Sequence, residues 1–222
     1  MMEQFPGFKL DEHVIVFEDD YLLVINKPPG MLVHPTVSES GTTLYDYVKA
    51  YYFENNINAD IHPVSRLDRN TSGLVLFAKE PIIQFWLSQR EIAKEYLAIV
   101  EGIPPEKDGF IEAPIARKEG SIIERCVDFE HGKTAKTHYQ VLQSDGSRSL
   151  VKLRLYTGRT HQIRVHMAYI GCPLVKDNLY GTPGPMDRHS LHAWKLSFIH
   201  PVSDEPLEIT CELPEDLQKL LP

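Results

Sequence analysis

The sequence predicts an α+β protein with a mixed, largely antiparallel sheet and flanking helices. Short apolar or alternating runs, bounded by glycine, proline and acidic turns, recur along the chain and are typical of strands. Helical spacing of apolar residues appears in only a few segments. These helices do not alternate with the strands in the βαβ order of a parallel sheet. The 222 residues, 42% of them hydrophobic, suit a single domain over 1–222 with a core from about 12 to 213.

The first half of the chain is predicted to contain two helices among its strands. Lys27-Pro28-Pro29-Gly30 ends the first hairpin, because proline cannot donate to a strand ladder and glycine permits a turn. A threonine is expected to cap the first helix, and Pro81 suits the first turn of the second. The predicted elements are a hairpin over 14–17 and 21–26, a helix over 44–53, a strand over 74–78, a helix from 81 to about 91 and a strand over 96–100.

The second half is dominated by strand patterns. Prolines and glycines punctuate residues 104–120, which we expect to form a loop. Strands are predicted over 121–128, 137–142, 150–156, 194–199 and 207–211, with a polar helical tail at the end. A helix is predicted over 161–170, capped by Thr160 and ended by Gly171.

The charge of the chain is unevenly distributed along the sequence. Its net charge is −8, which argues against a nucleic-acid partner. Residues 131–166, however, hold seven lysines and arginines against one acid, a net +6, so that the remainder carries −14. Taken alone, such a basic segment is more often a solvated face than a binding surface.

Other features exclude several classes of protein. No apolar run approaches the ~20 residues of a membrane span, and the N-terminus lacks a signal pattern, so we expect a cytoplasmic protein. Cys126, Cys172 and Cys211 form no CxxC pair and are expected to be buried free thiols. His161 and His166, like His189 and His192, are poorly spaced for metal ligation, so no metal is expected.

The segment most suited to chemistry is Arg66-Leu67-Asp68-Arg69-Asn70-Thr71-Ser72-Gly73, a polar loop that leads into the apolar strand 74–78. A rigid strand can hold such a loop in place. Nearby cations favour the ionised form of Asp68, and an ionised carboxylate can act as a nucleophile. A salt-bridged turn is the ordinary interpretation of an isolated motif of this kind.

Three blocks, in order, carry a resemblance to a known family. They are HPVSRLDRNTSGLVLFAK at 62–79, KEYLAIVEG at 94–102, and GRTHQIRVH at 158–166 followed by IGCP at 170–173 and DNLYG at 177–181. Together they resemble the RluA-type RNA pseudouridine synthases, and VINKPPGMLVHP at 24–35 is similar to the start of that catalytic domain. Ser65, Asn70 and Lys176 depart from the residues usual in the family, which bears on substrate preference more than on the reaction.

The resemblance implies a pseudouridine synthase catalytic fold with a central RNA-binding cleft and no cofactor. Many relatives carry a small S4 module in front of this domain, but only about a dozen residues precede it here, so we expect no such module. It marks Asp68 as the essential acid, Arg164 as its arginine partner, and Tyr96 as the residue that stacks on the target base and serves as a possible general base. Arg66 matches the arginine that displaces the flipped nucleotide, and Leu191 falls where relatives place an apolar residue beneath the base.

Around the third block, His161 and Gln162 are further candidates for substrate binding. Arg159 and the helix N-terminus suit a phosphate by charge and free N–H groups, although a simple capping loop fits the same residues.

The sequence therefore predicts an RNA pseudouridine synthase that acts on stem-loops of rRNA or tRNA. The alternative is a catalytically silent RNA-binding module, which would keep the basic segment and have no need of Asp68. A glycoside hydrolase ranks lower, because it requires two acids around one bond and the motifs contain one. The residues do not distinguish attack by the carboxylate on the nucleoside from abstraction of a ribose proton.

Overall fold

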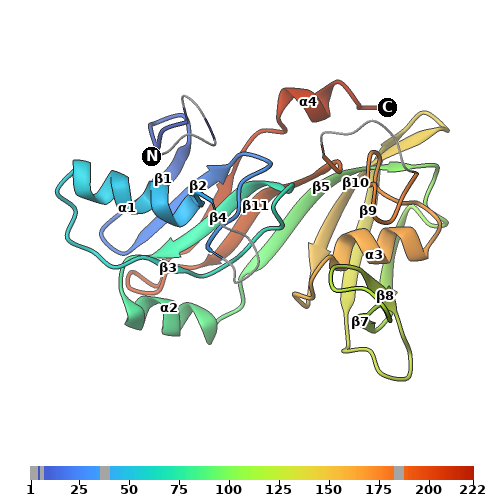
Figure 1. The fold of residues 1–222 in the computed structure, drawn as a ribbon, viewed down its shortest axis with the longest axis horizontal. Coiled ribbons are helices and arrows are strands. Elements are labelled where there is room, and N and C mark those ends of the chain that lie inside the picture. The colour runs from blue at the N-terminus through green and yellow to red at the C-terminus, as the bar shows by residue number, and fades with distance from the viewer. Residues whose placement is uncertain (1–4, 6–7, 36–40, 183–187) are drawn as a thin grey trace. The chain divides into compact units, whose positions relative to one another are not determined.

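The computed structural model describes residues 5, 8–35, 41–182 and 188–222 (Figure 1). The chain divides into two compact units, each made of two segments. Unit 1 comprises Met1–Ile92 and Lys195–Cys211, and unit 2 comprises Ala93–Trp194 and Glu212–Pro222. Within the described ranges, no helix is both long enough and apolar enough to span a bilayer.

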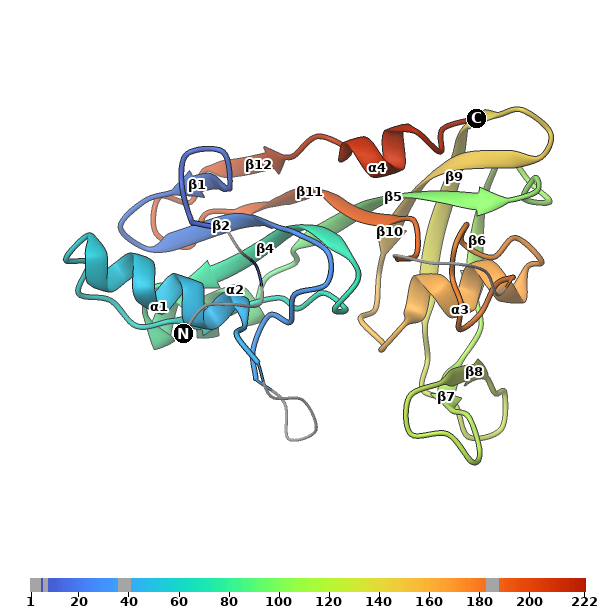
Figure 2. The same cartoon turned by 45° about the horizontal axis from the view of Figure 1, so that its top comes forward.

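Unit 1 is a small antiparallel sheet with two helices. Its elements are β1 (Ile15–Glu18), β2 (Leu22–Lys27), α1 (Leu44–Glu54), β3 (His62–Pro63), β4 (Ser72–Ala78), α2 (Pro81–Ser88), most of β11 (Leu191–Ile199) and β12 (Pro206–Thr210). The strand order is β1-β2-β4-β11, with β3 paired to β4 and β12 to β11. Figure 2 shows β11 and β12 running side by side.

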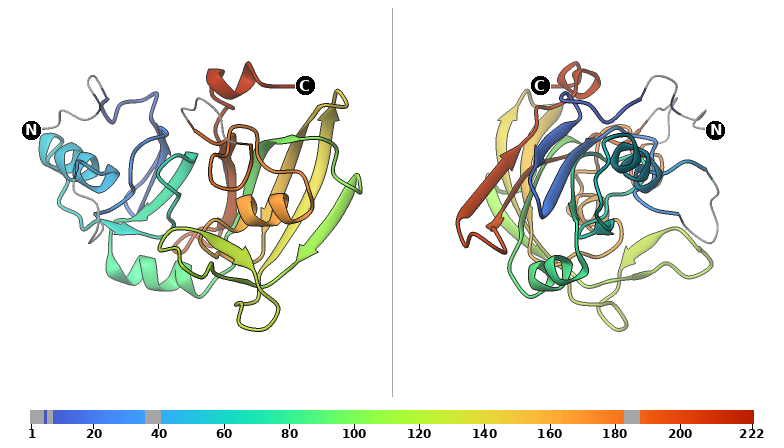
Figure 3. Two further views of the ribbon diagram at one scale, coloured as in Figure 1. Left: turned by 45° about the vertical axis from the view of Figure 1, so that its right-hand side comes forward. Right: turned by 90° about the vertical axis from the view of Figure 1, so that its left-hand side faces the viewer.

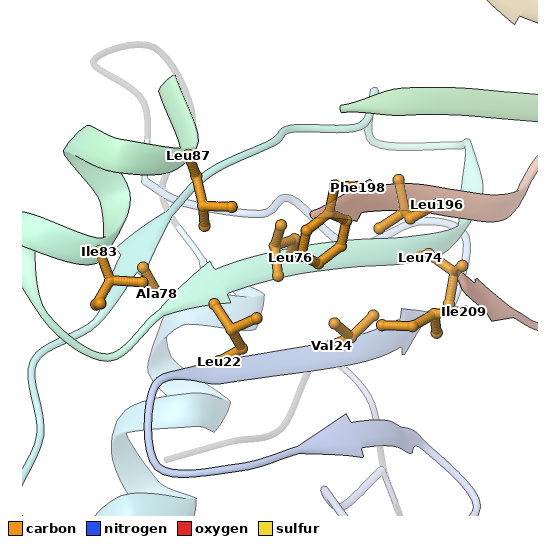
Figure 4. Close-up of a cluster of buried hydrophobic side chains, with 10 residues drawn as sticks. All are labelled: Leu22, Val24, Leu74, Leu76, Ala78, Ile83, Leu87, Leu196, Phe198 and Ile209. Atoms are coloured by element: carbon orange, nitrogen blue, oxygen red, sulfur yellow. The ribbon is translucent and has the colours of Figure 1, made fainter. Parts of the chain in front are cut away.

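The core of unit 1 lies along β4, whose seven residues are all buried. Side chains from β2, β4, α2, β11 and β12 meet in one cluster (Figure 4). Its members are Leu22, Val24, Leu74, Leu76, Ala78, Ile83, Leu87, Leu196, Phe198 and Ile209. Burying a Leu, Ile or Phe side chain contributes roughly 1.5–3 kcal/mol, so this cluster fixes the strand that follows the Asp68 loop.

Unit 2 is a second antiparallel sheet with one helix packed on it. Its elements are β5 (Ala93–Glu101), β6 (Asp108–Glu112), β7 (Ile115–Arg117), β8 (Arg125–Val127), β9 (Lys136–Ser144), β10 (Arg148–Leu155), α3 (Gln162–Tyr169), the start of β11, and α4 (Glu215–Gln218). The order is β5-β10-β9-β6, and β7 and β8 form a separate hairpin. Figure 3 shows α3 lying against the strands of this sheet. The two units confirm the predicted α+β class with a largely antiparallel sheet.

Most predicted elements are confirmed, and α1 is also capped as expected. The backbone N–H and hydroxyl of Thr43 both donate to the Asp46 carboxylate at 2.8 Å. The buried face of α1 includes Tyr52, whereas Tyr51 is only partly buried and its hydroxyl donates to Glu18 at 2.7 Å.

Three predictions about local structure were wrong. The predicted loop 104–120 contains β6 and β7, because Gly109 and Ile111 are buried on alternate positions of a strand despite the surrounding prolines. Helix α2 ends at Ser88 and buries Ile83 and Leu87, which leaves Phe85 and Trp86 exposed. Thr160 does not cap α3, because the N-cap is His161 in a left-handed conformation, with φ 57°.

Candidate active site

The Asp68 loop belongs to unit 1, and a tight turn fixes its C-terminal end. The Thr71 N–H donates to the Asp68 carbonyl at 3.0 Å. Thr71 and Ser72 are buried, and β4 then continues into the core. Asp68 itself is partly buried, whereas Arg66 and Arg69 are exposed. The loop therefore offers a carboxylate between two solvent-accessible guanidinium groups.

A buried lysine ties this loop to the end of β2. The Lys27 side chain is fully buried, and its Nζ donates to the carbonyls of Pro28 at 2.9 Å, Met31 at 2.8 Å and Arg69 at 3.1 Å. The Arg69 Nε in turn donates to the Gly30 carbonyl at 3.0 Å. These bonds join the turn after β2 to the residue beside Asp68, so the carboxylate is presented by a braced loop. Lys27 is a residue that sequence reasoning treated only as the end of a strand.

Tyr96 lies in unit 2, on β5, and is 7% exposed. It is paired with Leu153 of β10, and side chains directly opposite each other project from the same face of a sheet. Nearby, burial lowers the pKa of Lys94 below its ordinary value. Tyr96 is thus a buried side chain on a rigid strand, a position compatible with stacking on a base.

Arg164 projects from α3 and forms a buried, bidentate ion pair with Asp177. Its Nε and Nη2 donate to the two carboxylate oxygens of Asp177, each at 2.7 Å. The side chain of Asp177 is fully buried and that of Arg164 is 9% exposed. Arg164 is therefore not a surface arginine. Its predicted pairing with Asp68 stays a prediction, and Asp177 is a partner to which the sequence assigned no role.

The loop after α3 folds back to hold Asp177 in place. Besides Arg164, the carboxylate accepts N–H bonds from Leu179 at 3.0 Å and Tyr180 at 3.3 Å. Burial alone raises the pKa of Asp177, but the hydrogen bonds and charge of Arg164 outweigh it, so the pKa is below its ordinary value. A Cβ at Gly181 would lie 3.0 Å from the Asp177 carbonyl oxygen, which explains a glycine at this close approach.

Tyr180 links this ion pair to His161. The Arg164 guanidinium carbon lies 4.9 Å from the centre of the Tyr180 ring, within the range of a cation–π contact. The Tyr180 hydroxyl accepts a bond from the Arg125 N–H at 2.8 Å and shares one of 2.7 Å with His161 Nδ1. His161 therefore keeps an unfavourable left-handed backbone within a fixed network, as is common at functional sites.

Gln162 and Arg159 stabilise the turn before α3. The Gln162 oxygen accepts from Thr157 Oγ1 and the Arg159 N–H, and its amide nitrogen donates to Lys136 O and Thr137 Oγ1. All four hydrogen-bonding positions of this buried amide are occupied. Arg159 is exposed and its Nε donates to the Thr134 carbonyl at 3.0 Å. A role for either residue in RNA binding stays a prediction, although only Arg159 is accessible.

Leu191, at the start of β11, is 4% exposed, and its carbonyl accepts a bond of 3.4 Å from Arg188. Arg188 is held by a bidentate pair with Asp216 of α4, with bonds of 2.6 and 2.9 Å. His189, beside these residues, has a pKa lowered to about 3, chiefly by burial and then by the charge of Arg164. It is therefore a neutral imidazole at neutral pH.

The basic segment 131–166 is partly neutralised by acids on neighbouring strands. Lys136 of β9 pairs with Glu112 of β6 at 2.6 Å, and Glu95 of β5 lies directly opposite Arg154 of β10. Lys133, Arg148 and Arg159 are the exposed basic residues of the segment. The net charge of +6 counted along residues 131–166 therefore overstates the charge of the folded surface.

Within the described ranges, no three His, Cys, Asp or Glu side chains are grouped to hold a metal ion. Both ring nitrogens of His166 are engaged, with Thr137 Oγ1 and the Ala113 carbonyl at 2.9 Å each. Of the three free cysteines, Cys172 is buried as expected, whereas Cys126 and Cys211 are only partly buried.

The predicted site residues thus fall into two groups. Arg66 and Asp68 share one braced loop of unit 1. In unit 2, Arg159, His161, Gln162 and Arg164 gather at the start of α3, Tyr96 lies on β5 and Leu191 opens β11.

Known proteins resemble this chain in sequence and in fold. The family described as RNA pseudouridylate synthase matches residues 21–169. Uncharacterized RNA pseudouridine synthase YjbO of Bacillus subtilis (strain 168) is 40% identical over 212 residues, which cover 93% of this chain and 75% of that protein. Ribosomal large subunit pseudouridine synthase D of Nitrosomonas europaea is 39% identical over 221 residues, covering 93% of this chain and 64% of that protein.

Among solved structures, Human RNA Pseudouridylate Synthase Domain Containing 4 superimposes with a TM-score of 0.77 at 26% identity, covering 92% of this chain and 90% of that one. The chain therefore belongs to the RNA pseudouridylate synthase family as an RluA-type member, an isomerase that converts uridine to pseudouridine in RNA.

Proposed function

We propose that this chain isomerises specific uridines in structured rRNA or tRNA, with Asp68 as the essential carboxylate. The observation that carries the proposal is the bracing of the Asp68 loop by Lys27, Arg69 and the buried strand β4. Preorganised geometry of this kind is what a catalytic group needs. The similarity to a protein named for the ribosomal large subunit favours rRNA as the first substrate to test.

The proposed reaction needs only the RNA and the side chains of the protein. The target uridine leaves its stack, the N-glycosidic bond breaks, the uracil turns, and C5 bonds to the sugar. A proton then leaves C5 for a base and N1, freed from the sugar, takes up one proton, so the product is an isomer and no electron is gained or lost. Asp68 either attacks the nucleoside or takes a proton from the ribose, and both routes require the ionised carboxylate.

The other residues are assigned supporting roles. Tyr96 stacks on the target base, and Arg164 balances the charge of the reacting carboxylate. Arg66 is exposed beside Asp68 and displaces the extruded nucleotide, while Leu191 supports the base from below. The protein is expected to work in the cytoplasm, where rRNA and tRNA are modified.

Substitution of Asp68→Asn tests the proposal. An amide is nearly isosteric with the carboxylate but is a feeble nucleophile and base, so pseudouridine formation should fall by at least ~10³-fold, or roughly 4 kcal/mol of barrier. RNA affinity should stay within a few fold, because it depends on phosphate contacts elsewhere. Pseudouridine would be mapped at nucleotide resolution in rRNA and tRNA from cells with and without the gene, and then assayed with purified protein.

The matched control is Asp60→Asn, which removes an exposed acid from the same unit eight positions earlier. It should leave the rate unchanged. Thermal melting of both variants separates lost chemistry from lost folding. A folded Asp68→Asn protein that still converts its RNA at the parent rate would remove Asp68 from the mechanism.

A further inference from the structure

Tyr180, in the loop after α3, is assigned no role in the proposed reaction, yet it contacts several residues of the site. Its ring lies against the Arg164 guanidinium, its N–H donates to the Asp177 carboxylate, and its hydroxyl bonds to His161. All four residues belong to unit 2. A residue that contacts several members of a site in this way is a candidate for holding them in place.

The Arg164 guanidinium is held along one edge and over one face. Because the group is planar, its orientation is fixed only when both the direction of an edge and the tilt of its plane are set. The two bonds of 2.7 Å to Asp177 set the edge that carries Nε and Nη2, but they allow the plane to tilt about the carboxylate. The Tyr180 ring centre lies 4.9 Å from the guanidinium carbon, so the ring covers one face and restricts this tilt.

The ring of Tyr180 is itself held at its hydroxyl end. The hydroxyl accepts a bond of 2.8 Å from the Arg125 N–H on β8 and shares one of 2.7 Å with His161 Nδ1. Burial raises the pKa of Tyr180, so the hydroxyl keeps its proton at neutral pH. The ring also packs against a buried cluster of Ile115, Ala135 and Val165. A ring fixed in this way can impose a position on the guanidinium beside it.

The loop that carries Tyr180 is closed by main-chain hydrogen bonds. The Val175 N–H donates to the Ile99 carbonyl of β5 at 2.8 Å, and the Gly181 N–H donates to the Asp177 carbonyl at 2.7 Å. A cation over an aromatic ring is attracted more strongly where water is excluded, and the side chain of Arg164 is only 9% exposed. The contact between ring and guanidinium is therefore both strong and anchored.

We propose that Tyr180 is a positioning residue, which through the face of its ring holds the Arg164 guanidinium in the orientation that the reaction needs. The proposal rests on the proposed function for the role of Arg164. Displacement of a catalytic group by about 1 Å can cost ~10²-fold in rate. Loss of the ring should therefore slow isomerisation and leave RNA affinity almost unchanged.

Two substitutions separate the ring from the hydroxyl. Tyr180→Leu removes both, whereas Tyr180→Phe keeps the ring. Single-turnover rates, with enzyme in excess over an RNA that the parent isomerises, should fall by about 10- to 100-fold in Tyr180→Leu and by less than about 3-fold in Tyr180→Phe. Dissociation constants for the same RNA should stay within about 2-fold in both, because phosphate contacts elsewhere dominate affinity.

The matched control is Tyr169→Leu, the same change at a 54% exposed ring of α3. It should leave both the rate and the RNA affinity unchanged. Melting curves show whether each variant is folded at the temperature of the assay.

A double-mutant cycle tests whether Tyr180 acts through Arg164. Arg164→Gln removes the cation on which the ring acts, so the variant should be slower than the parent. In that background Tyr180→Leu should cost less than about 3-fold, because its target is already gone. A general loosening of unit 2 would instead lower the rate by the same factor in both backgrounds, and such additive losses would overturn the proposal.

The Nε–H proton of Arg164 gives a readout that does not require activity. Protons over the face of an aromatic ring resonate at lower chemical shift than they do without the ring. In protein with ¹⁵N-labelled arginine, the Arg164 Nε–H signal should move to higher chemical shift in Tyr180→Leu. It should stay near the parent position in Tyr180→Phe and in Tyr169→Leu.

The outcomes separate this proposal from the proposed function. A folded Tyr180→Leu protein that isomerises RNA at the parent rate overturns the positioning role alone. Equal losses of rate in Tyr180→Phe and Tyr180→Leu also overturn it, because the hydroxyl and not the ring would then be responsible. A parent protein that isomerises no RNA, while its Arg164 signal depends on the Tyr180 ring as expected, overturns the proposed function and supports the contact.

Discussion

The buried ion pair between Arg164 and Asp177 is the contact that fixes α3 to the loop after it. Removing one partner of a buried ion pair leaves an uncompensated charge, which typically costs 3–5 kcal/mol. We predict that Asp177→Asn lowers the free energy of unfolding by about that amount, as measured by urea denaturation.

Asp216→Asn provides the matched control, because Asp216 makes the same bidentate contact with Arg188 but has a 55% exposed side chain. Water reaches that site, so a smaller loss is expected. Equal losses in the two variants would show that burial does not decide the cost.

His189 makes the stability dependent on pH. Its pKa is about 3 in the folded protein and close to 6.5 when unfolded, so between these values the unfolded chain binds more protons. The contribution of His189 to the free energy of unfolding is therefore fully present above about pH 6.5. It is lost as the pH falls toward 3, by up to ~1.4 kcal/mol per pH unit. The burial-lowered pKa of His166 acts in the same direction.

We predict that His189→Gln reduces the difference between urea midpoints measured at pH 7 and at pH 5. The charged groups that act on His189, besides burial, are Arg164, Asp177, Arg188 and His161, and none of them is changed. An identical pH dependence in parent and variant would show that His189 does not take up the proton on unfolding.

At the residue scale, sequence reasoning identified the candidate groups but not the residues that hold them. Asp68 and Arg164 stand in recognisable motifs, whereas Asp177 lies 13 positions after Arg164 and reaches it only because the chain folds back. Lys27 contacts Arg69 across 42 positions. Such partners follow from tertiary structure, and hydrophobic periodicity contains no information about them.

At the scale of elements, Lys27 connects the end of β2 to the Asp68 loop. Lys27→Met keeps much of the volume but leaves three carbonyls without their donor, at ~1–3 kcal/mol for each buried acceptor. We predict a loss of several kcal/mol in stability and, in folded protein at low temperature, a lower kcat, because the carboxylate is held less firmly.

Lys49→Met makes the same change on the exposed side of α1 and should shift stability by less than ~0.5 kcal/mol. Parent-like kcat in folded Lys27→Met would mean that the loop is held adequately by its turn and by Arg69.

The strands and helices themselves were largely predictable, and the failures have identifiable causes. Prolines and glycines around β6 and β7 suggested a loop, but the intervening residues still pair with β9 and β8. The apolar residues of α2 surround most of the helix, and packing in the cluster with β4 buries Ile83 and Leu87 rather than Phe85 and Trp86. His161 at the start of α3 has a backbone conformation that propensity disfavours and tertiary contacts impose.

At the scale of the whole molecule, charge is divided between the units. Unit 1 has 8 basic and 16 acidic residues, and unit 2 has 15 of each. The basic segment lies entirely in unit 2, where cross-strand acids offset part of it. Strands bring together residues that are distant in sequence, so a linear count of charge cannot describe a sheet surface.

We predict that RNA binding weakens steeply with salt, and that Lys133→Gln and Arg159→Gln each flatten the slope of log K against log salt by about 0.7–0.9. Lys136→Gln should flatten it less, because Glu112 already neutralises that charge. Binding constants across a salt series measure these slopes, with Lys49→Gln in unit 1 as the control. A slope that none of the unit 2 changes affects would make the basic segment an ordinary solvated face.

The core of unit 1 also has a consequence for synthesis on the ribosome. Its strands β2 and β4 are made first, but Leu196, Phe198 and Ile209, which complete the same cluster, follow more than 100 residues later. At 5–20 residues per second, roughly 7–26 s pass between Ala78 and Ile209. During that interval Leu22, Val24, Leu74 and Leu76 lack part of their cover, and the nascent chain presents an incomplete apolar surface to chaperones. In unit 2, the cluster of Ile99 and Val175 is likewise incomplete until Leu217 has been made. Neither unit of this enzyme completes its core until Ile209 and Leu217, respectively, have been added.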